Sequence, residues 1–182
     1  MATSTKTYYS VTETAQMLRQ ALKQRFPGVS FSVKSKSYSG GASINVKWTD
    51  GPRASEVKEV TNRFEGATFD GSIDLKSHID QVVMTDEGPK AVHFGADFIF
   101  ENRHFSADFL SRVYRRACQR YGLTPRVNAI RSTSWGAELT DEAAYDKLTS
   151  DASWNNNQVR DAVWRMSAKT VIHNGLLVEY KD

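Results

Sequence analysis

The stretch that decides the fold is FSVKSKSYSGGASINVKW, residues 31–48. Apolar and polar side chains alternate on both sides of a short Ser-Tyr-Ser-Gly-Gly turn, and a period of two is typical of a strand that is buried on one side only. Gly40 and Gly41 can take the positive φ values that a tight reversal needs. We therefore predict an amphipathic β-hairpin here.

The two faces of this hairpin differ in chemistry. One face is apolar and is expected to pack on the core; it consists of Phe31, Val33, Ile44, Val46 and Trp48. The other face is polar and carries most of the charge; it consists of Lys34, Lys36, Asn45 and Lys47, with Tyr38 at the turn.

Helices are predicted on either side of the hairpin. The sequence SVTE at 10–13 is a capping box, in which a serine hydroxyl and a glutamate carboxylate satisfy each other's backbone N–H groups. Apolar residues then recur at helical spacing, which predicts a helix over 11–25. The same spacing predicts a second, shorter helix over 53–64. The first part of the chain thus reads helix, strand, strand, helix.

The middle of the chain is less regular. Residues 67–90 mix Asp-Gly turn signals with short apolar runs, and we interpret them as a loop with one or two short strands. Residues 91–101 alternate and are predicted to form a strand. Ser106 and Gly122 are typical of the two ends of a helix, which is predicted to reach about residue 121. The buried face of the strand at 91–101 is expected to hold Val92, Phe94, Ala96, Phe98 and Phe100.

The C-terminal part continues the mixture of helices and strands. A strand is predicted over 126–135, a short helix over 141–149 and a longer helix over 157–173. Asn174-Gly175 either ends that helix or turns a hairpin, and the LLVEY that follows is predicted to be a strand. Together the elements predict an α+β protein, in which an antiparallel sheet carries helices mainly on one face.

Length and composition favour one ordinary globular domain over residues 1–182. The chain is 40% hydrophobic and 25% charged, which is sufficient for a core and gives no sign of disorder. No apolar run approaches the roughly 18 residues that span a bilayer, and MATSTKTYYS lacks the apolar core of a signal peptide. The single cysteine, Cys118, excludes an intrachain disulfide and is interpreted as core filler. We therefore expect a cytoplasmic protein.

The net charge of +3 hides an uneven distribution. Residues 1–60 carry a net charge of +5 and residues 101–130 a net charge of +4, whereas 61–100 and 131–182 carry −4 and −2. Alternating blocks of this kind can steer a charged partner even when the total is small. An ordinary mixed surface is the alternative interpretation.

Two basic surfaces are the candidate binding sites. The lysines of the hairpin, with Tyr38, resemble a strand platform that contacts phosphates and stacks a base. On the helix that follows Ser106, one side is rich in arginine, whose planar fork suits phosphate or carboxylate. Solvated faces that only confer solubility are the alternative for both. The residues concerned are Lys34, Lys36, Tyr38 and Lys47 on the hairpin, and Arg112, Arg115, Arg116 and Arg120 on the helix.

Catalytic and metal-binding patterns are weaker than their structural alternatives. The sequence contains neither a nucleotide-binding glycine loop nor a pair of histidines at helical spacing. His93 and Asp97, with Glu101 and His104 nearby, would permit a metal or acid/base cluster, but separate histidines are the simpler interpretation. We therefore expect no enzyme activity, no cofactor and no metal.

Three longer motifs carry a resemblance to a known family. They are FPGVSFSVKSKSYSGGASINVKWTDGP, FEGATFDGSIDLKS and GADFIFENRHFS. Over residues 10–110 the chain resembles the large polyvalent protein-associated domain family number twenty-nine, which consists of small α+β modules of phages, plasmids and other mobile elements. The resemblance implies a core at 10–110 with an extension packed on it at 111–182. It also implies an association with proteins that protect or process incoming DNA, and no catalytic residues.

Two functions then compete. The first is a non-enzymatic protein that binds the backbone of DNA or RNA through its basic surfaces. The second is a counter-defence protein that inhibits a host immune complex, such as CRISPR or restriction machinery, by direct protein binding. The basic surfaces favour the first, and the alternating acidic and basic blocks fit the second.

Overall fold

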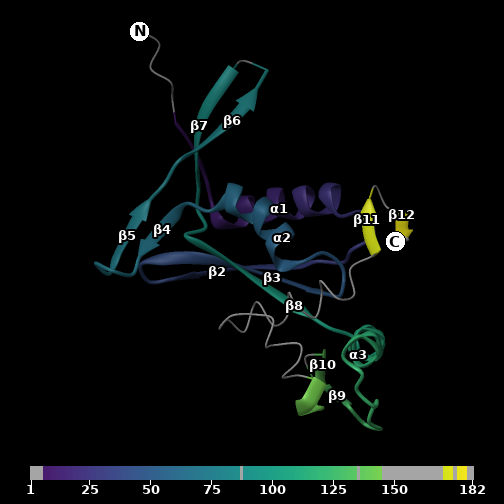
Figure 1. Cartoon of the computed structure of the whole chain (residues 1–182). Coiled ribbons are helices and arrows are strands. Elements are labelled where there is room, and N and C mark those ends of the chain that lie inside the picture. The colour runs from purple at the N-terminus through teal and green to yellow at the C-terminus, as the bar shows by residue number, and fades with distance from the viewer. Residues whose placement is uncertain (1–5, 87, 135, 145–169, 174–175, 180–182) are drawn as a thin grey trace. The chain divides into compact units, whose positions relative to one another are not determined.

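The structure is a computed structural model that describes residues 6–86, 88–134, 136–144, 170–173 and 176–179 (Figure 1). The chain forms two compact units. The first comprises residues 1–47 and 55–102, and the second comprises residues 48–54 and 103–182. A single domain over the whole chain stays a prediction.

The N-terminal part of the chain confirms the predicted helix-strand-strand-helix unit and adds a short strand before it. In the capping box of the first helix, Glu13 N–H donates to Ser10 Oγ at 3.3 Å and Ser10 N–H donates to Glu13 Oε2 at 2.8 Å. The elements are β1 (Thr7–Tyr9), α1 (Val11–Arg25), β2 (Ser32–Tyr38), β3 (Gly41–Thr49), α2 (Ala54–Thr61) and the short 3₁₀ helix η1 (Asn62–Phe64).

The β2–β3 hairpin has the register that its alternation predicts. Lys34 is paired with Asn45, and Tyr38 is paired with Gly41. Directly paired residues of an antiparallel hairpin lie on the same face, so one face is apolar and the other carries the lysines. The buried side chains of the apolar face are Val33, Ile44, Val46 and Trp48.

Two helices cover the apolar face of this hairpin. Figure 1 shows α1 and α2 on the same side of β2 and β3. Arg19 Nη2 donates to Val33 O at 2.7 Å, which joins α1 to β2. Leu18 and Leu22 of α1 and Val57 of α2 are fully buried. The α+β class, with helices on one face of the sheet, is therefore confirmed.

Three strands and the start of a fourth lie within residues 67–90, so the prediction of a loop with one or two short strands is wrong. They are β4 (Ala67–Asp70), β5 (Leu75–His78), β6 (Gln81–Thr85) and β7 (Gly88–Phe94). β4 pairs with β5 and β6 with β7, both antiparallel, and β1 joins β7 in parallel. Most side chains of β4, β5 and β6 are exposed, so no buried face imposes an alternating pattern on this sequence.

The strand predicted over 91–101 is two strands, β7 and β8 (Phe98–His104). The chain leaves the first sheet at Gly95, whose N–H donates to Tyr9 O at 2.8 Å; a Cβ at this position would lie 2.6 Å from the same oxygen. After Gly95 the chain joins the β2–β3 hairpin, where Asp97 N–H donates to Ala42 O at 2.8 Å. The described strands thus lie in several small sheets, of which β2-β3-β8 is the one that contains the hairpin.

The break between β7 and β8 shifts the alternation by one residue. Val92, Phe94 and Ala96 are buried as predicted. In β8, however, Ile99 is 4% exposed and Phe100 is 51% exposed. The prediction that Phe100 shares the buried face of Val92 is therefore wrong, because the chain changes sheet between them.

The second unit is built on α3 (Ala107–Tyr121), which has the predicted ends. Phe109 N–H donates to Ser106 Oγ at 3.1 Å, and Gly122 ends the helix with a φ of 64°. β9 (Ile130–Thr133) falls inside the strand predicted at 126–135, and it pairs antiparallel with β10 (Gly136–Leu139). Both strands contribute side chains to the apolar cluster beneath α3. The helix predicted at 141–149 lies largely outside the described residues.

The helix predicted over 157–173 is wrong for residues 170–173, which form a strand. β11 (Thr170–His173) pairs antiparallel with β12 (Leu176–Glu179), which agrees with the hairpin alternative. Thr170, Val171 and Ile172 are β-branched, and such residues favour strands over helices. Residues 157–169 of that helix, with Trp154 and Trp164, lie outside the described residues. None of the helices described is both long enough and apolar enough to cross a membrane.

Candidate nucleic-acid interface

Three lysines lie on the face of the β2–β3 hairpin opposite the helices, where Ser43 is buried between them. Lys34 and Lys36 are two residues apart on β2 and so point the same way, and Lys47 lies on the same face of β3. All three side chains are exposed. Within the described part of the chain, none of them forms an ion pair or a side-chain hydrogen bond. Their charge is thus not neutralised by a described carboxylate.

Tyr38 lies at the turn end of the same face. Its side chain is 47% exposed, and it is paired with Gly41 across the hairpin. The aromatic ring therefore stands in line with Lys36 and Lys34 along β2, as the alternation predicts. We define the lysine face as Lys34, Lys36, Tyr38 and Lys47 together with the other residues on that side of β2 and β3.

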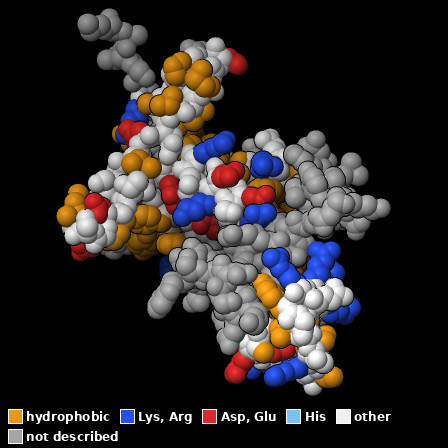
Figure 2. All heavy atoms as spheres, viewed as in Figure 1, with side chains coloured by type: hydrophobic (Ala, Val, Ile, Leu, Met, Phe, Trp, Pro, Cys, Tyr) orange, Lys and Arg blue, Asp and Glu red, His pale blue; other side chains and the backbone are white. Residues whose placement is uncertain are grey.

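The arginines of α3 form a second basic surface in the second unit. Figure 2 shows Lys and Arg side chains gathered over this helix. The opposite side of α3 is buried, including Val113, Ala117 and Cys118, so helical periodicity directs the arginines outward. The guanidinium of Arg120 lies 5.8 Å from the ring centre of Tyr121. The exposed arginines are Arg112, Arg115, Arg116 and Arg120, as the sequence predicts.

The WTDGP motif positions the start of α3. Asp50 accepts hydrogen bonds from Ser106, at 2.9 Å from its N–H and 2.7 Å from its hydroxyl. Arg103, which is 5% exposed, donates from Nε to Asp50 O and from Nη2 to Gly51 O, both at 3.0 Å. Asp50 itself has a φ of 54°, which aspartate tolerates better than most residues. This motif is therefore a structural device.

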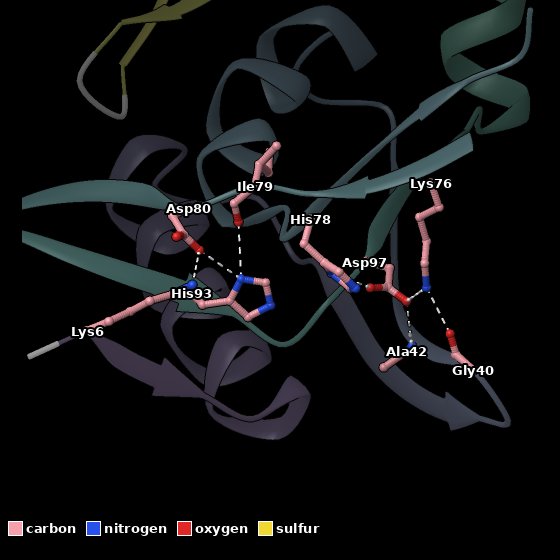
Figure 3. Close-up of polar contacts among 9 residues, drawn as sticks. All are labelled: Lys6, Gly40, Ala42, Lys76, His78, Ile79, Asp80, His93 and Asp97. Carbon is pink, nitrogen blue, oxygen red and sulfur yellow. Dashed lines mark hydrogen bonds and ion pairs between the residues drawn. The ribbon is translucent and has the colours of Figure 1, made fainter. Parts of the chain in front are cut away.

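The other motifs meet at the carboxylate of Asp97 (Figure 3). Asp97 is 8% exposed, and its Oδ2 accepts from Ala42 N–H at 3.2 Å and from Lys76 Nζ at 3.1 Å. Lys76 also donates to Gly40 O at 2.8 Å. A Cβ at Gly41 would lie 2.1 Å from Asp97 Oδ2, so a larger residue there would force Asp97 to move. The ion pair of Lys76 and Asp97 thus joins the DLKS and GAD segments, and the hydrogen bond from Lys76 to Gly40 O joins them to SYSGG.

The histidine cluster that the sequence permits does not form. His93 Nδ1 lies 3.2 Å from Asp80 Oδ1, and Lys6 Nζ lies 2.7 Å from the same oxygen (Figure 3). The hydrogen bond from Lys6 holds the pKa of Asp80 below its usual value. Asp97 has Lys76 as its partner instead, with His78 Nδ1 4.0 Å from its other oxygen.

Glu101 accepts a hydrogen bond from Thr61 of α2. Desolvation raises the pKa of its carboxyl group, although the bond from Thr61 opposes the shift. Across the described residues, no group of three or more His, Cys, Asp and Glu side chains is arranged to hold a metal ion. The expectation that the protein is not an enzyme is untested by this geometry.

Sequence reasoning missed one residue of the candidate interface. Phe100 of β8 is exposed, although the sequence places it in the core. The signal that could have revealed it is Gly95, because a glycine inside a strand pattern often marks an interruption after which the alternation changes phase.

Comparison with known proteins identifies the family. The family model described as large polyvalent protein associated domain 29 matches residues 9–106, and the chain belongs to this family. The match agrees with the resemblance read from the motifs and fits a mobile-element setting. No curated protein and no solved structure matches the chain.

Proposed function

We propose that this protein is a non-enzymatic accessory protein of a mobile element that binds the backbone of nucleic acid through its basic surfaces. The observation that supports the proposal most directly is the lysine face, where Lys34, Lys36 and Lys47 are exposed without a described carboxylate partner. Three cations on one side of a rigid hairpin suit a chain of phosphates. The arginine surface of α3 supplies a second contact of the same sign.

The proposal is tested by gel retardation at low salt with the full chain. One variant replaces the three lysines (Lys34→Ala, Lys36→Ala and Lys47→Ala), and another replaces three arginines of α3 (Arg112→Ala, Arg116→Ala and Arg120→Ala). We expect the wild-type protein to retard DNA or RNA and both variants to do so less. A matched control removes the same charge from other elements (Lys23→Ala, Lys58→Ala and Lys90→Ala) and should bind nearly as the wild type does.

Two results would contradict the proposal. Either the wild-type protein fails to retard any nucleic acid at about 50 mM salt, where counterion release makes such binding strong, or the control variant loses as much binding as the lysine variant. In the second case only the total charge matters, and the lysine face has no special role.

A second candidate function is favoured by the β6–β7 hairpin. Val82 is 70% exposed and Met84 is 74% exposed on β6, and Figure 2 shows hydrophobic side chains along this arm. Exposed apolar side chains on an edge strand are typical of protein-binding sites. This surface supports a counter-defence protein that binds a host immune complex directly. Affinity capture from a nuclease-treated host lysate, with Val82→Lys and Met84→Lys as the comparison variant, would test it; recovery of the same proteins by both would contradict it.

A further inference from the structure

The lysine face extends beyond the hairpin onto a third strand. β8 lies next to β3 in the sheet β2-β3-β8. Along β8, Ile99 is buried and the carboxylate of Glu101 accepts from Thr61 of α2, so these two side chains point to the side that the helices cover. Because side chains alternate along a strand, Phe98 and Phe100 point to the opposite side, which is the lysine face.

Two exposed aromatic rings thus share a sheet surface with the three lysines. Tyr38 on β2 is 47% exposed and Phe100 on β8 is 51% exposed. They stand on the two outer strands of the sheet, with the residues of β3 between them. Large aromatic side chains are usually withdrawn from water, so their exposure at the same surface needs a reason.

The charge of this surface has one sign. The residues on this side of β2, β3 and β8 are lysine, serine, threonine, asparagine, glycine, tyrosine, phenylalanine and one histidine, His104, so that none of the three strands contributes a carboxylate to it. Asp97 borders the surface at Gly41, but it is nearly buried and is paired with Lys76. A partner that meets this face therefore encounters cations and aromatic rings together.

We propose that the lysine face binds single-stranded nucleic acid, with bases stacked on Tyr38 and Phe100 and phosphates held by the lysines. This inference rests on the proposed function and names its substrate class. Base stacking on aromatic side chains requires unpaired bases, whereas a duplex conceals the faces of its bases. Residues at i and i+2 of a strand are about 6.6 Å apart, so Lys34, Lys36 and Tyr38 can follow an extended strand of nucleotides.

The experiment compares four probes by fluorescence anisotropy: single strands of deoxythymidine and of uridine of about 12 nucleotides, a duplex, and an abasic deoxyribose-phosphate strand of equal length. The abasic strand carries the phosphates without bases, which separates stacking from charge. We expect the base-bearing single strands to bind more tightly than both the abasic strand and the duplex. The preference over the abasic strand should fall by about 5- to 150-fold for each ring removed in Tyr38→Ala and Phe100→Ala.

Two control variants make the result specific. Tyr38→Phe keeps the ring and should bind as the wild type does. Tyr8→Ala removes an aromatic side chain that is 67% exposed on β1, in a different sheet, and should also leave binding unchanged. The unfolding temperature of each variant, followed by circular dichroism, shows that the fold is intact.

Each outcome has one meaning. Loss of the preference over the abasic strand in both ring variants supports the inference. Equal binding of abasic and base-bearing strands, or tighter binding of the duplex, overturns the inference and leaves backbone binding in place. Failure of the wild-type protein to bind any of the four probes overturns both the inference and the proposed function, and would favour a protein partner.

Discussion

At the scale of single residues, the turn of the β2–β3 hairpin depends on a glycine and a buried carboxylate. Asp97 lies 55 residues from Ala42 in the chain, yet its Oδ2 accepts the Ala42 N–H and contacts Lys76. The space that it occupies is the space a side chain at Gly41 would need. The sequence shows Gly40-Gly41 as a turn, but it does not show that an aspartate from a distant segment requires the second glycine.

We predict that Gly41→Ala destabilises the protein by about 1–3 kcal/mol, the usual range for overpacking a filled site. The added methyl would displace Asp97 and leave Lys76 without its carboxylate. Chemical denaturation measures the change. Gly71→Ala is the control, because its Cβ would meet nothing nearer than 3.8 Å. Equal losses for the two variants would contradict this role of Gly41.

The buried pair of Tyr114 and Asp141 gives a pH-dependent prediction. Tyr114 donates its hydroxyl proton to Asp141 Oδ2 and accepts from Arg126 N–H at 2.8 Å. Burial raises the pKa of Tyr114 to about 12, and the hydrogen bond from Tyr114 lowers the pKa of Asp141. Because the pKa of Asp141 is lowered, its contribution to stability is present at pH values above its unfolded-state pKa and is lost as pH falls through the folded-state pKa. Because the pKa of Tyr114 is raised, its contribution is present below its unfolded-state pKa and is lost as pH rises through the folded-state pKa.

We therefore expect Tyr114→Phe to cost about 1–3 kcal/mol of unfolding free energy, because it leaves Oδ2 of the buried Asp141 without the hydroxyl that donates to it. The difference from the wild type should be largest between about pH 4 and pH 10 and shrink outside this window, where one partner has the wrong charge. Urea denaturation across this pH range measures it. A difference that stays constant from pH 3 to 11 would show that the hydroxyl is not coupled to Asp141.

At the scale of elements, the start of α3 is stabilised by its N-cap residue, Ser106. Ser106 caps the helix and is itself bound by Asp50 from the WTDGP motif. Replacing Ser106 with alanine removes the two hydrogen bonds of its hydroxyl and keeps the backbone bond to Asp50, so we expect a loss of about 1–2 kcal/mol, toward the upper end for a helix cap. Thermal unfolding measures the loss. Ser111→Ala, inside the same helix, should be neutral or slightly stabilising because alanine is the better helix former; a similar loss there would contradict the cap.

Local signals explain which elements the sequence predicts well. The helices α1 and α3 have capping residues and a periodic apolar face, and their bounds follow from residues next to one another. The strands β4, β5 and β6 have neither signal, since their stability comes from pairing and their side chains face water. The change of phase between β7 and β8 depends on contacts of Gly95 and Asp97 with β1 and β3, which are distant in the chain.

The residues of the candidate site also differ in whether local sequence patterns predict their orientation. The orientation of Lys34, Lys36 and Lys47 follows from alternation within one hairpin, and that of the α3 arginines follows from helical periodicity. Phe100 joins the lysine face only because β8 lies next to β3. The pairing of β8 with β3 is a tertiary contact that the local sequence does not reveal, and the alternation over 91–101 predicted that Phe100 is buried.

At the scale of the whole molecule, the region that matches the family model contains both residues that hold the fold together and residues that carry exposed charge. Asp97, Asp50 and Gly41 are engaged in structural contacts, whereas the lysines have no described partner. Structural and exposed charged residues thus alternate within one motif, because residues 26–52 contain Gly41 and Asp50 as well as Lys34, Lys36 and Lys47.

The salt dependence of single-strand binding tests the central claim most directly. Each phosphate contact of a single strand contributes about 0.7 to the slope of log K against log salt concentration. Replacing Lys34, Lys36 and Lys47 with alanine should therefore reduce the slope by about 2 and leave the unfolding temperature nearly unchanged. An unchanged slope in this variant, with the protein still folded, would show that the lysine face does not contact phosphates.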